Sequence, residues 1–298
     1  AKGDVSGAEA ELREALKIDP YHAPTHRALG ILHDQAGQFE EALREYQEAL
    51  KSENRFADVH HAIGLIYAKQ GKLEQAEVQT KEALRIDPQY AEAFVSLGII
   101  YDRKGLKQKS LDANAQAVQL DPRAYQAYSN MAVVYIKDGQ YAKAEELLRK
   151  ALEVKPDYPE AYNNLAAIYM DQKDLKKAMD AAEQALRYRP NYPEALTNLG
   201  ILSYEQKQFE RALDYHQRAV AANPNYWEAR NNLALTLMQL HRYVEAAEEF
   251  TKVLRAQPQL PALHKRLGDL YFDHLKDWIN ARKHYEIFLR LTPPAGKE

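Results

Sequence analysis

The sequence contains no cysteine among its 298 residues. Disulfide bonds, thiolate metal sites and a cysteine nucleophile are therefore excluded. Long apolar runs are missing too: none approaches the roughly 18 residues of a membrane span, and the N-terminal stretch AKGDVSGAEA has no hydrophobic core of a signal peptide. We therefore expect no membrane insertion. Neither absence identifies a compartment: the cytoplasm is weakly favoured, and an exported or periplasmic location stays open.

An excess of charge of one sign is also absent. The 40 Lys and Arg residues nearly balance the 43 Asp and Glu residues, which gives a net charge of −3 at pH 7. Such a chain has no bulk attraction to nucleic acid or anionic lipid, so we expect no nucleic-acid partner. With 46% hydrophobic and 28% charged residues, the composition is that of soluble globular protein, long enough for two ordinary domains or one extended array.

Catalytic motifs are missing as well. The sequence has no glycine-rich phosphate loop, nucleophile elbow or HExxH motif. Four histidines invite a metal-site interpretation: His22, His26, His60 and His61. Two of them recur at one position of the repeat described next, where other repeats carry aromatic residues, so we expect structural histidines. The sequence thus predicts no enzyme activity, no metal and no cofactor.

Prolines reveal an internal period of 34 residues. They stand at this spacing, or at a multiple of it, at Pro20, Pro88, Pro122, Pro156, Pro190, Pro224 and Pro258. A fixed period indicates tandem structural units. We expect eight, over residues 23–56, 57–90, 91–124, 125–158, 159–192, 193–226, 227–260 and 261–295. Residues 1–22 are then the second helix of a truncated preceding repeat, cut from a longer chain, and residues 296–298 are a tail.

Small side chains recur at three positions of this repeat. Position 8 is Gly or Ala throughout, position 20 is Ala or Ser from Ala42 to Ala246, and position 27 is Ala from Ala49 to Ala219. Small residues let helices approach closely. Glycine at position 15 suits the left-handed residue that ends a helix, and the proline at position 32 ends a second one. Each repeat is thus predicted to be two packed helices.

The ends of the helices carry further signals. Asp157, Asn191 and Asn225 follow the position-32 prolines, and we expect them to cap the next helix. In the last repeat the pattern decays: one extra residue precedes Ala281, and Phe288 replaces the small residue of position 27. We expect the array to end there, because a bulky side chain prevents close approach of another repeat.

These positions resemble the tetratricopeptide repeat family, whose unit is a helix–turn–helix of 34 residues, and the resemblance covers nearly the whole chain. It implies an all-α fold, a right-handed superhelical solenoid of tandem repeats in which each repeat buries its apolar face against its neighbours. It also implies a concave groove where extended peptides usually bind, lined by positions 2, 5, 6, 9, 12 and 13 of the first helix. We therefore expect a protein or peptide partner.

Asparagine recurs on that groove face although it is a poor helix former. Position 6 carries Asn130, Asn164, Asn198 and Asn232, and position 5 carries Asn163 and Asn231. They contribute nothing obvious to the contacts between repeats. An amide has both donors and an acceptor, so this asparagine ladder could pair with the backbone of an extended chain. It resembles the asparagines that line the repeats of O-linked N-acetylglucosamine transferase. The alternative is that asparagine is simply common at this position of the family.

Apolar residues run beside the ladder. Position 9 is apolar in seven consecutive repeats, whereas position 12 is apolar only from the fourth repeat onward. The predicted contact residues in these rows are Val133, Ile136, Met170, Ile201, Tyr204, Leu235 and Met238. An apolar stripe on a groove marks a binding surface, and methionines make it adaptable. The alternative for position 9 is burial between adjacent helices. Ladder and rows coincide in repeats 4–7, which predicts one peptide site there.

Charge changes sign along the groove at position 13. Lys69, Arg103 and Lys137 are basic, whereas Asp171 and Glu205 are acidic. Exposed charges of this kind add little affinity but can fix the direction of a ligand. A solvated charged face is the alternative.

The predicted function is a protein-interaction scaffold that binds an extended or helical segment of a partner. The predicted groove includes Lys265 and Arg266. These two residues are also the only match to the clamp with which some members of the family hold chaperone C-termini, so the sequence argues against that kind of binding. Position 9 never carries the asparagine that this clamp needs. Two alternatives stay open: a substrate-recruiting region of a larger enzyme, and a structural scaffold that self-associates through its end repeats.

Overall fold

The fold is known from a computed structural model, which describes residues 5–53 and 55–292. The predicted tail 296–298, residues 293–295 of the last repeat and residues 1–4 lie outside this range. Every regular element within it is a helix, and no strand occurs among the described residues. The predicted all-α fold is therefore confirmed.

The helices alternate along the chain in pairs. The first helix of each pair begins at position 1 of the repeat numbering: α2 (Ala23–Gln35), α4 (Ala57–Lys69), α6 (Ala91–Arg103), α8 (Tyr125–Lys137), α10 (Pro159–Asp171), α12 (Pro193–Glu205), α14 (Trp227–Gln239) and α16 (Pro261–Leu270). The second helices are α3 (Phe39–Ser52), α5 (Leu73–Ile86), α7 (Lys107–Leu120), α9 (Tyr141–Val154), α11 (Leu175–Tyr188), α13 (Phe209–Ala222), α15 (Tyr243–Ala256) and α17 (Trp278–Leu291). Ahead of them lies α1 (Val5–Ile18).

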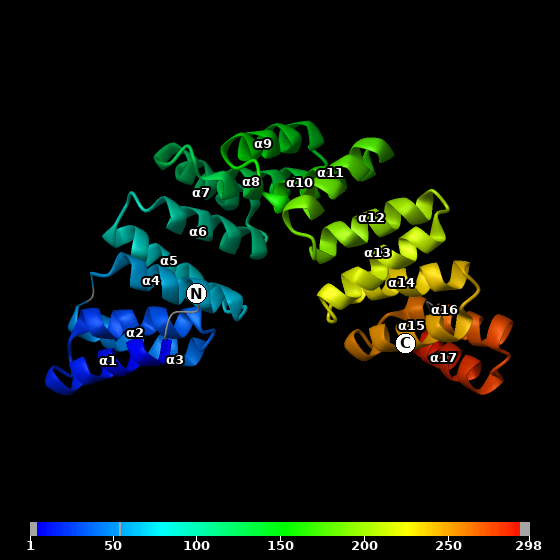
Figure 1. The fold of residues 1–298 in the computed structure, drawn as a ribbon, viewed down its shortest axis with the longest axis horizontal. Helices are drawn as coiled ribbons and strands as arrows, with labels where there is room; N and C mark the ends of the chain where they lie inside the picture. Colours follow the sequence, from blue (N-terminus) through cyan, green and yellow to red (C-terminus); the bar gives the residue numbers. More distant parts are fainter. Residues whose placement is uncertain (1–4, 54, 293–298) are drawn as a thin grey trace. The chain divides into compact units, whose positions relative to one another are not determined.

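The chain divides into two compact units, Ala1–Pro156 and Asp157–Glu298. We call them unit 1, which contains α1–α9, and unit 2, which contains α10–α17. Within each unit the helices pack in chain order, and the two helices of a pair make the most extensive contacts (Figure 1). Each pair therefore buries its apolar side against sequence neighbours, as in other stacked-repeat folds.

The small residue at position 8 makes room for the side chain at position 24, on the second helix. A Cβ atom on Gly98 would overlap the amide of Asn114, and one on Gly200 would overlap the ring of His216. Asn114 is 0% exposed and His216 is 1% exposed. Glycine is therefore required here by close approach of a side chain to the helix backbone.

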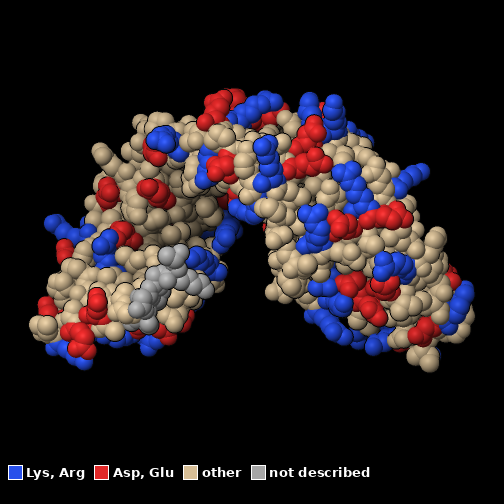
Figure 2. Space-filling view, in the orientation of Figure 1, with Lys and Arg blue, Asp and Glu red and all other residues tan. Residues whose placement is uncertain are grey.

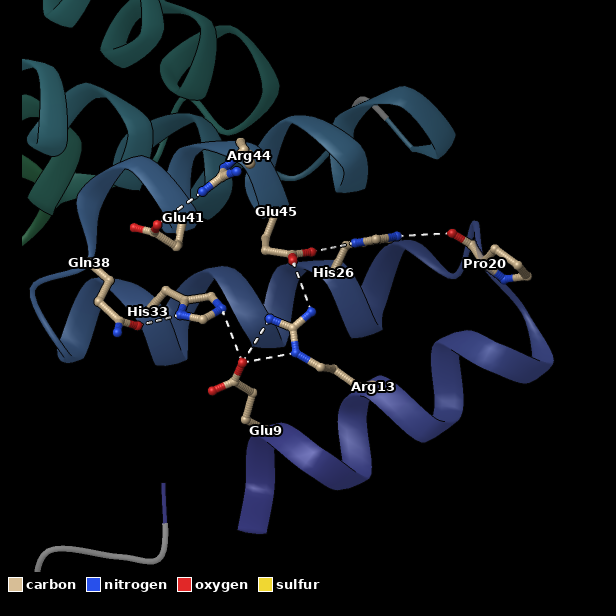
Figure 3. Close-up of polar contacts among 9 residues, drawn as sticks. All are labelled: Glu9, Arg13, Pro20, His26, His33, Gln38, Glu41, Arg44 and Glu45. Atoms are coloured by element: carbon tan, nitrogen blue, oxygen red, sulfur yellow. Dashed lines mark hydrogen bonds and ion pairs between the residues drawn. The ribbon is translucent and has the colours of Figure 1, made fainter. Parts of the chain in front are cut away.

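The side chain at position 4 joins successive repeats. Figure 3 shows His26 of α2 between two partners: its Nδ1 lies 2.7 Å from Oε2 of Glu45 in α3, and its Nε2 lies 3.0 Å from the carbonyl oxygen of Pro20. In unit 2, Arg230 likewise donates a 3.0 Å hydrogen bond to the carbonyl of Pro224. Histidine and arginine thus perform one structural task, which is to hold the proline turn against the next helix pair.

The residue that ends each first helix is left-handed, as position 15 predicted. In unit 1 it is glycine, with φ between 70° and 76°: Gly37, Gly71, Gly105 and Gly139. In unit 2 it is a residue with a side chain, with φ between 55° and 61°: Lys173, Lys207, His241 and Lys276. A left-handed conformation costs such residues free energy that glycine avoids.

The extra residue of the last repeat is absorbed by a π-helical turn. Residues Tyr271–Leu275 (η1) follow α16 directly, and Lys276 then ends the turn with φ 55°. Insertions inside α-helices commonly take this form. Because the extra residue is accommodated there, α17 still begins in its usual place after the turn.

The predicted helix caps are wrong. The N-cap residues of α10, α12 and α14 are Tyr158, Tyr192 and Tyr226, and none of the three makes a side-chain cap hydrogen bond within the described chain. Ahead of α14 the turn is held by the residue before the proline. Asn223 accepts a 3.0 Å hydrogen bond from the backbone of Asn225, which is a side-chain turn of the kind that Asn and Asp favour.

Candidate functional site

Unit 2 carries most of the predicted groove residues, on three successive first helices. All of those on α10, α12 and α14 are partly buried: Asn163, Asn164, Met170, Asn198, Ile201, Tyr204, Asn231, Asn232, Leu235 and Met238. The predicted residues of repeat 4 lie on α8 in unit 1 and are partly buried as well: Asn130, Val133 and Ile136. Side chains that remain partly accessible in this way are available to a ligand.

Some asparagines of the ladder bond within the chain. In unit 2 the Nδ2 of Asn198 donates a 2.9 Å hydrogen bond to Oδ1 of Asn163, which links α12 to α10. In unit 1 the Nδ2 of Asn130 donates a 3.2 Å hydrogen bond to Oδ1 of Asn114, which links α8 to α7. The prediction that the ladder takes no part in contacts between repeats is therefore wrong for these residues. Their amides reach across because the neighbouring helix places a polar side chain opposite them.

The remaining amides of the ladder have no such partner. Asn164, Asn231 and Asn232 make no side-chain hydrogen bond to another residue in the described part of the chain. Each therefore keeps two donors and an acceptor for other groups. They lie on α10 and α14, the same helices that carry Met170 and Met238.

The charges at position 13 have structural partners in unit 1. The Nζ of Lys137 lies 2.7 Å from Oδ2 of Asp102, and the Nζ of Lys69 lies 3.7 Å from Oδ1 of Asp34. Each pair joins position 13 of one repeat to position 12 of the repeat before it. Position 12 is therefore acidic in repeats 1 and 3 because it pairs with a lysine, and such exposed pairs stabilise only weakly.

A cavity of about 230 Å³ opens on the candidate surface of unit 2. Its lining combines α12, α13 and α14: Ile201, Tyr204, Glu205, His216, Asn232 and Leu235. All but His216 belong to positions that the sequence singled out. His216 was missed because it stands at position 24 of the second helix. The signal that would have found it is a polar residue at position 24 combined with glycine at position 8.

His216 is the buried titratable group of this cavity. Burial lowers the pKa of its imidazole to about 4, so the ring is neutral at pH 7. Its Nδ1 atom is buried and has no hydrogen-bond partner among the residues that the structure describes. A buried polar atom without a partner costs free energy, so a ligand group that supplies the partner gains affinity.

Lys265 and Arg266 are exposed on α16 and do not line the cavity. The Nζ of Lys265 lies 3.0 Å from Oδ2 of Asp269 on the same helix. The guanidinium of Arg266 lies 5.9 Å from the ring centroid of Phe250. Both side chains therefore have partners within unit 2.

The four histidines considered as metal ligands bond to other side chains or to the backbone. Besides the contacts of His26, the short distances join His22 to Thr25 (2.7 Å), His60 to Gln79 (2.7 Å) and His61 to Ser96 (2.8 Å). In residues 5–53 and 55–292, no group of three or more His, Asp or Glu side chains is arranged to hold a metal ion.

Basic and acidic side chains are interspersed on the face of each unit seen in Figure 2. Neither sign gathers into one large patch there. Among the helices described above, none is long and apolar enough to cross a membrane.

Comparison with protein families identifies the repeat. A model described as the cilia and flagella-associated protein 70 C-terminal domain matches residues 55–267, and a TPR repeat model matches residues 34–71. No curated protein matches the chain in sequence.

Solved structures resemble the fold. Cut9–Hcn1 of the APC/C matches with a TM-score of 0.70 and 17% identity over 86% of this chain, which spans 50% of that one. The human IFIT1 dimer with m7Gppp-AAAA matches with a TM-score of 0.68 and 20% identity, over 97% of this chain and 74% of that one. YrrB, described as a TPR protein with an unusual peptide-binding site, matches with a TM-score of 0.51 and 24% identity, over 62% of this chain and 95% of that one.

Identities this low show a likeness of fold alone. That fold is typical of protein–protein interaction scaffolds. The chain belongs to the tetratricopeptide repeat family, in the branch described as the cilia and flagella-associated protein 70 C-terminal domain.

Proposed function

We propose that this chain is a protein-interaction scaffold that binds an extended segment of a partner along α10, α12 and α14. The observation that carries the proposal is the combination, on one partly buried surface of unit 2, of unpartnered amides with an apolar row. Asn164 and Asn232 supply the amides, and Met170, Tyr204 and Met238 supply the row. The proposal includes the division of residues 23–295 into eight repeats, which defines the equivalent positions.

The two kinds of side chain would act on different parts of a bound segment. The amides pair with its backbone N–H and C=O groups, whatever its sequence, and each such hydrogen bond contributes about 0.5–1.5 kcal/mol. The apolar row covers alternate side chains of the segment, which gains about 25 cal/mol for each Å² removed from water. Affinity then comes from both, and sequence preference comes mainly from the apolar row.

The fold neighbours support this class of function. Cut9–Hcn1 is a protein complex, and YrrB is described by its peptide-binding site. The IFIT1 dimer holds a capped RNA instead. The nearly balanced charge of the present chain, −3 overall, supports a protein segment over RNA, since RNA binding draws on a basic surface.

A library of displayed 16-residue peptides, selected on the whole chain, tests the proposal. Selected peptides should bind Met238→Glu at least about tenfold more weakly than wild type, because the substitution places a charge in the apolar row. Leu65→Glu is the matched control: Leu65 is 36% exposed at position 9 of α4 in unit 1, outside the proposed surface. Peptides that bind wild type and Met238→Glu equally well would place the binding site elsewhere.

A further inference from the structure

The cavity on unit 2 lies between positions 24 and 6 of successive repeats, and in unit 1 the same two positions bond to each other. There, position 24 of repeat 3 is Asn114, and its Oδ1 accepts a hydrogen bond from Asn130 at position 6 of the next repeat, at 3.2 Å. Its Nδ2 donates to the backbone oxygen of Ser110 at 2.8 Å. The buried amide therefore has partners on both sides, and its contact with the next repeat is made within the chain.

The same two positions are His216 and Asn232 in repeats 6 and 7. Here both side chains line the cavity, yet no hydrogen bond joins them in the described chain. The buried Nδ1 of His216 has no partner, and the amide of Asn232 has none either. Two polar groups that meet in unit 1 thus face a shared space in unit 2.

The cavity accepts a ring. Engineered cavities of about 150 Å³ hold a benzene molecule, and this one measures about 230 Å³. Ile201 and Leu235 supply aliphatic walls, and Tyr204 supplies an aromatic one. Aromatic side chains gain most from such surroundings, because they bury a large area at a low entropy cost.

The polar groups define what the ring must carry. A neutral imidazole nitrogen either donates or accepts a hydrogen bond, depending on the tautomer, and a hydroxyl group can satisfy both cases. A purely apolar ring would leave the nitrogen unpaired. Glu205 lines the cavity as well, and its carboxylate disfavours an anionic ligand by charge repulsion.

From this combination we infer that the cavity is a subsite for a tyrosine side chain of the bound partner, with its phenol hydroxyl at the imidazole of His216 and beside the amide of Asn232. The inference rests on the groove function proposed above and adds the chemical identity of one anchor residue. Serine or threonine would leave most of the volume empty. Leucine or phenylalanine would fill it without satisfying His216.

Two small probes that differ by one hydroxyl group test this with the full chain. N-acetyl-tyrosinamide and N-acetyl-phenylalaninamide are titrated while the NMR signals of the Ile201 methyl group and the His216 ring are followed. We expect both signals to shift, with the tyrosine amide binding about 2- to 12-fold more tightly, which is the worth of one neutral hydrogen bond. Unshifted signals, or equal affinity for both amides, would overturn the inference.

Two variants separate the imidazole from the cavity walls. His216→Leu introduces leucine at position 24, where repeat 4 also has a leucine, Leu148. This variant should bind both amides with equal affinity. His216→Asn reproduces the Asn114 arrangement, so we expect it to bond to Asn232 and to weaken binding of the tyrosine amide. A preference for tyrosine that persists unchanged in both variants would refute the role of His216.

The peptide selection distinguishes this inference from the proposed function. If selected peptides depend on Met238 yet bind His216→Leu and wild type equally, the groove function stands and the tyrosine subsite falls. If the tyrosine amide binds at His216 but no peptide depends on Met238, the subsite stands and the proposed groove function falls.

Discussion

At the scale of single residues, one substitution at equivalent positions should have two outcomes. Asn130→Ala removes the partner of the fully buried Asn114, and an unsatisfied buried group costs about 1–3 kcal/mol of unfolding free energy. Asn232→Ala removes an amide that bonds to no described side chain, so stability should change by less than about 0.5 kcal/mol. Urea denaturation of the two variants beside wild type measures the difference. Equal losses would show that the Asn114–Asn130 bond contributes nothing particular.

The acid sensitivity of the fold should depend on His216. Burial lowers its pKa from 6.5 to about 4. Between these values the unfolded chain binds a proton that the folded chain does not, so unfolding free energy falls as the pH is lowered, by up to about 3 kcal/mol. Above about pH 7 the imidazole is neutral in both states and has no such effect.

Urea denaturation at pH 7 and pH 4.5 checks this. Burial also lowers the pKa of His284, to about 4, and that of His61, so wild type carries three such imidazoles. His216→Leu should therefore lose less stability on acidification than wild type, because one of these imidazoles is removed. Glu205 lines the same cavity and is present in both proteins. The same pH dependence in both would show that His216 is protonated as easily in the folded chain as in the unfolded one.

At the scale of the helix pair, substitutions of the left-handed residue after the first helix should change the unfolding free energy in opposite directions in the two units. Lys207 has φ 60°, and Lys207→Gly should raise unfolding free energy by about 1 kcal/mol because glycine adopts this conformation without strain. Gly71→Ala should lower it by a similar amount. No described atom lies within 4 Å of a Cβ placed on Gly71, so crowding adds nothing. Chemical denaturation of both variants is the measurement, and a loss of stability in Lys207→Gly would contradict it.

The helix pairs were predictable from sequence because their signals are local and repeated. The proline period, the small residues at position 8 and the glycines at position 15 each reflect one requirement of backbone geometry. The caps were mispredicted because Asn225 and its equivalents stand one residue too early, and the turn is held by Asn223 instead. Local spacing alone does not show which of two neighbouring polar residues captures a backbone N–H group.

The candidate site was only partly predictable. Its first-helix residues follow from helical spacing, since Ile201, Asn232 and Leu235 do line the cavity. Partners contributed by a different helix do not follow from spacing, which is why His216 and the Asn114–Asn130 bond were missed. Such pairs depend on how closely the side chain at position 24 packs against the neighbouring first helix. That distance is set by the residue at position 8, which lies on a different helix.

At the scale of the whole molecule, the destabilising effect of a substitution should stay near the substituted residue. Gly98→Leu adds a side chain where even a Cβ atom would overlap Asn114, and overpacking of this kind costs about 1–3 kcal/mol. Each repeat contacts only its neighbours, and α6 belongs to unit 1. Hydrogen exchange should therefore accelerate in α5–α8 and remain near wild-type rates in α12–α17. Uniform acceleration along the chain would mean that the array unfolds as one cooperative body.

The pairing of positions 8 and 24 also bears on how such an array diversifies. The glycines at position 8 face side chains of several kinds on the second helix: Gly30 and Gly268 face tyrosines, whereas Gly64, Gly98 and Gly200 face Thr80, Asn114 and His216. A single codon change at position 24 therefore alters the depth and polarity of the space between one helix pair and the next. Binding preference can therefore change at one position 24 at a time, by evolution or by design, while the repeat fold is kept.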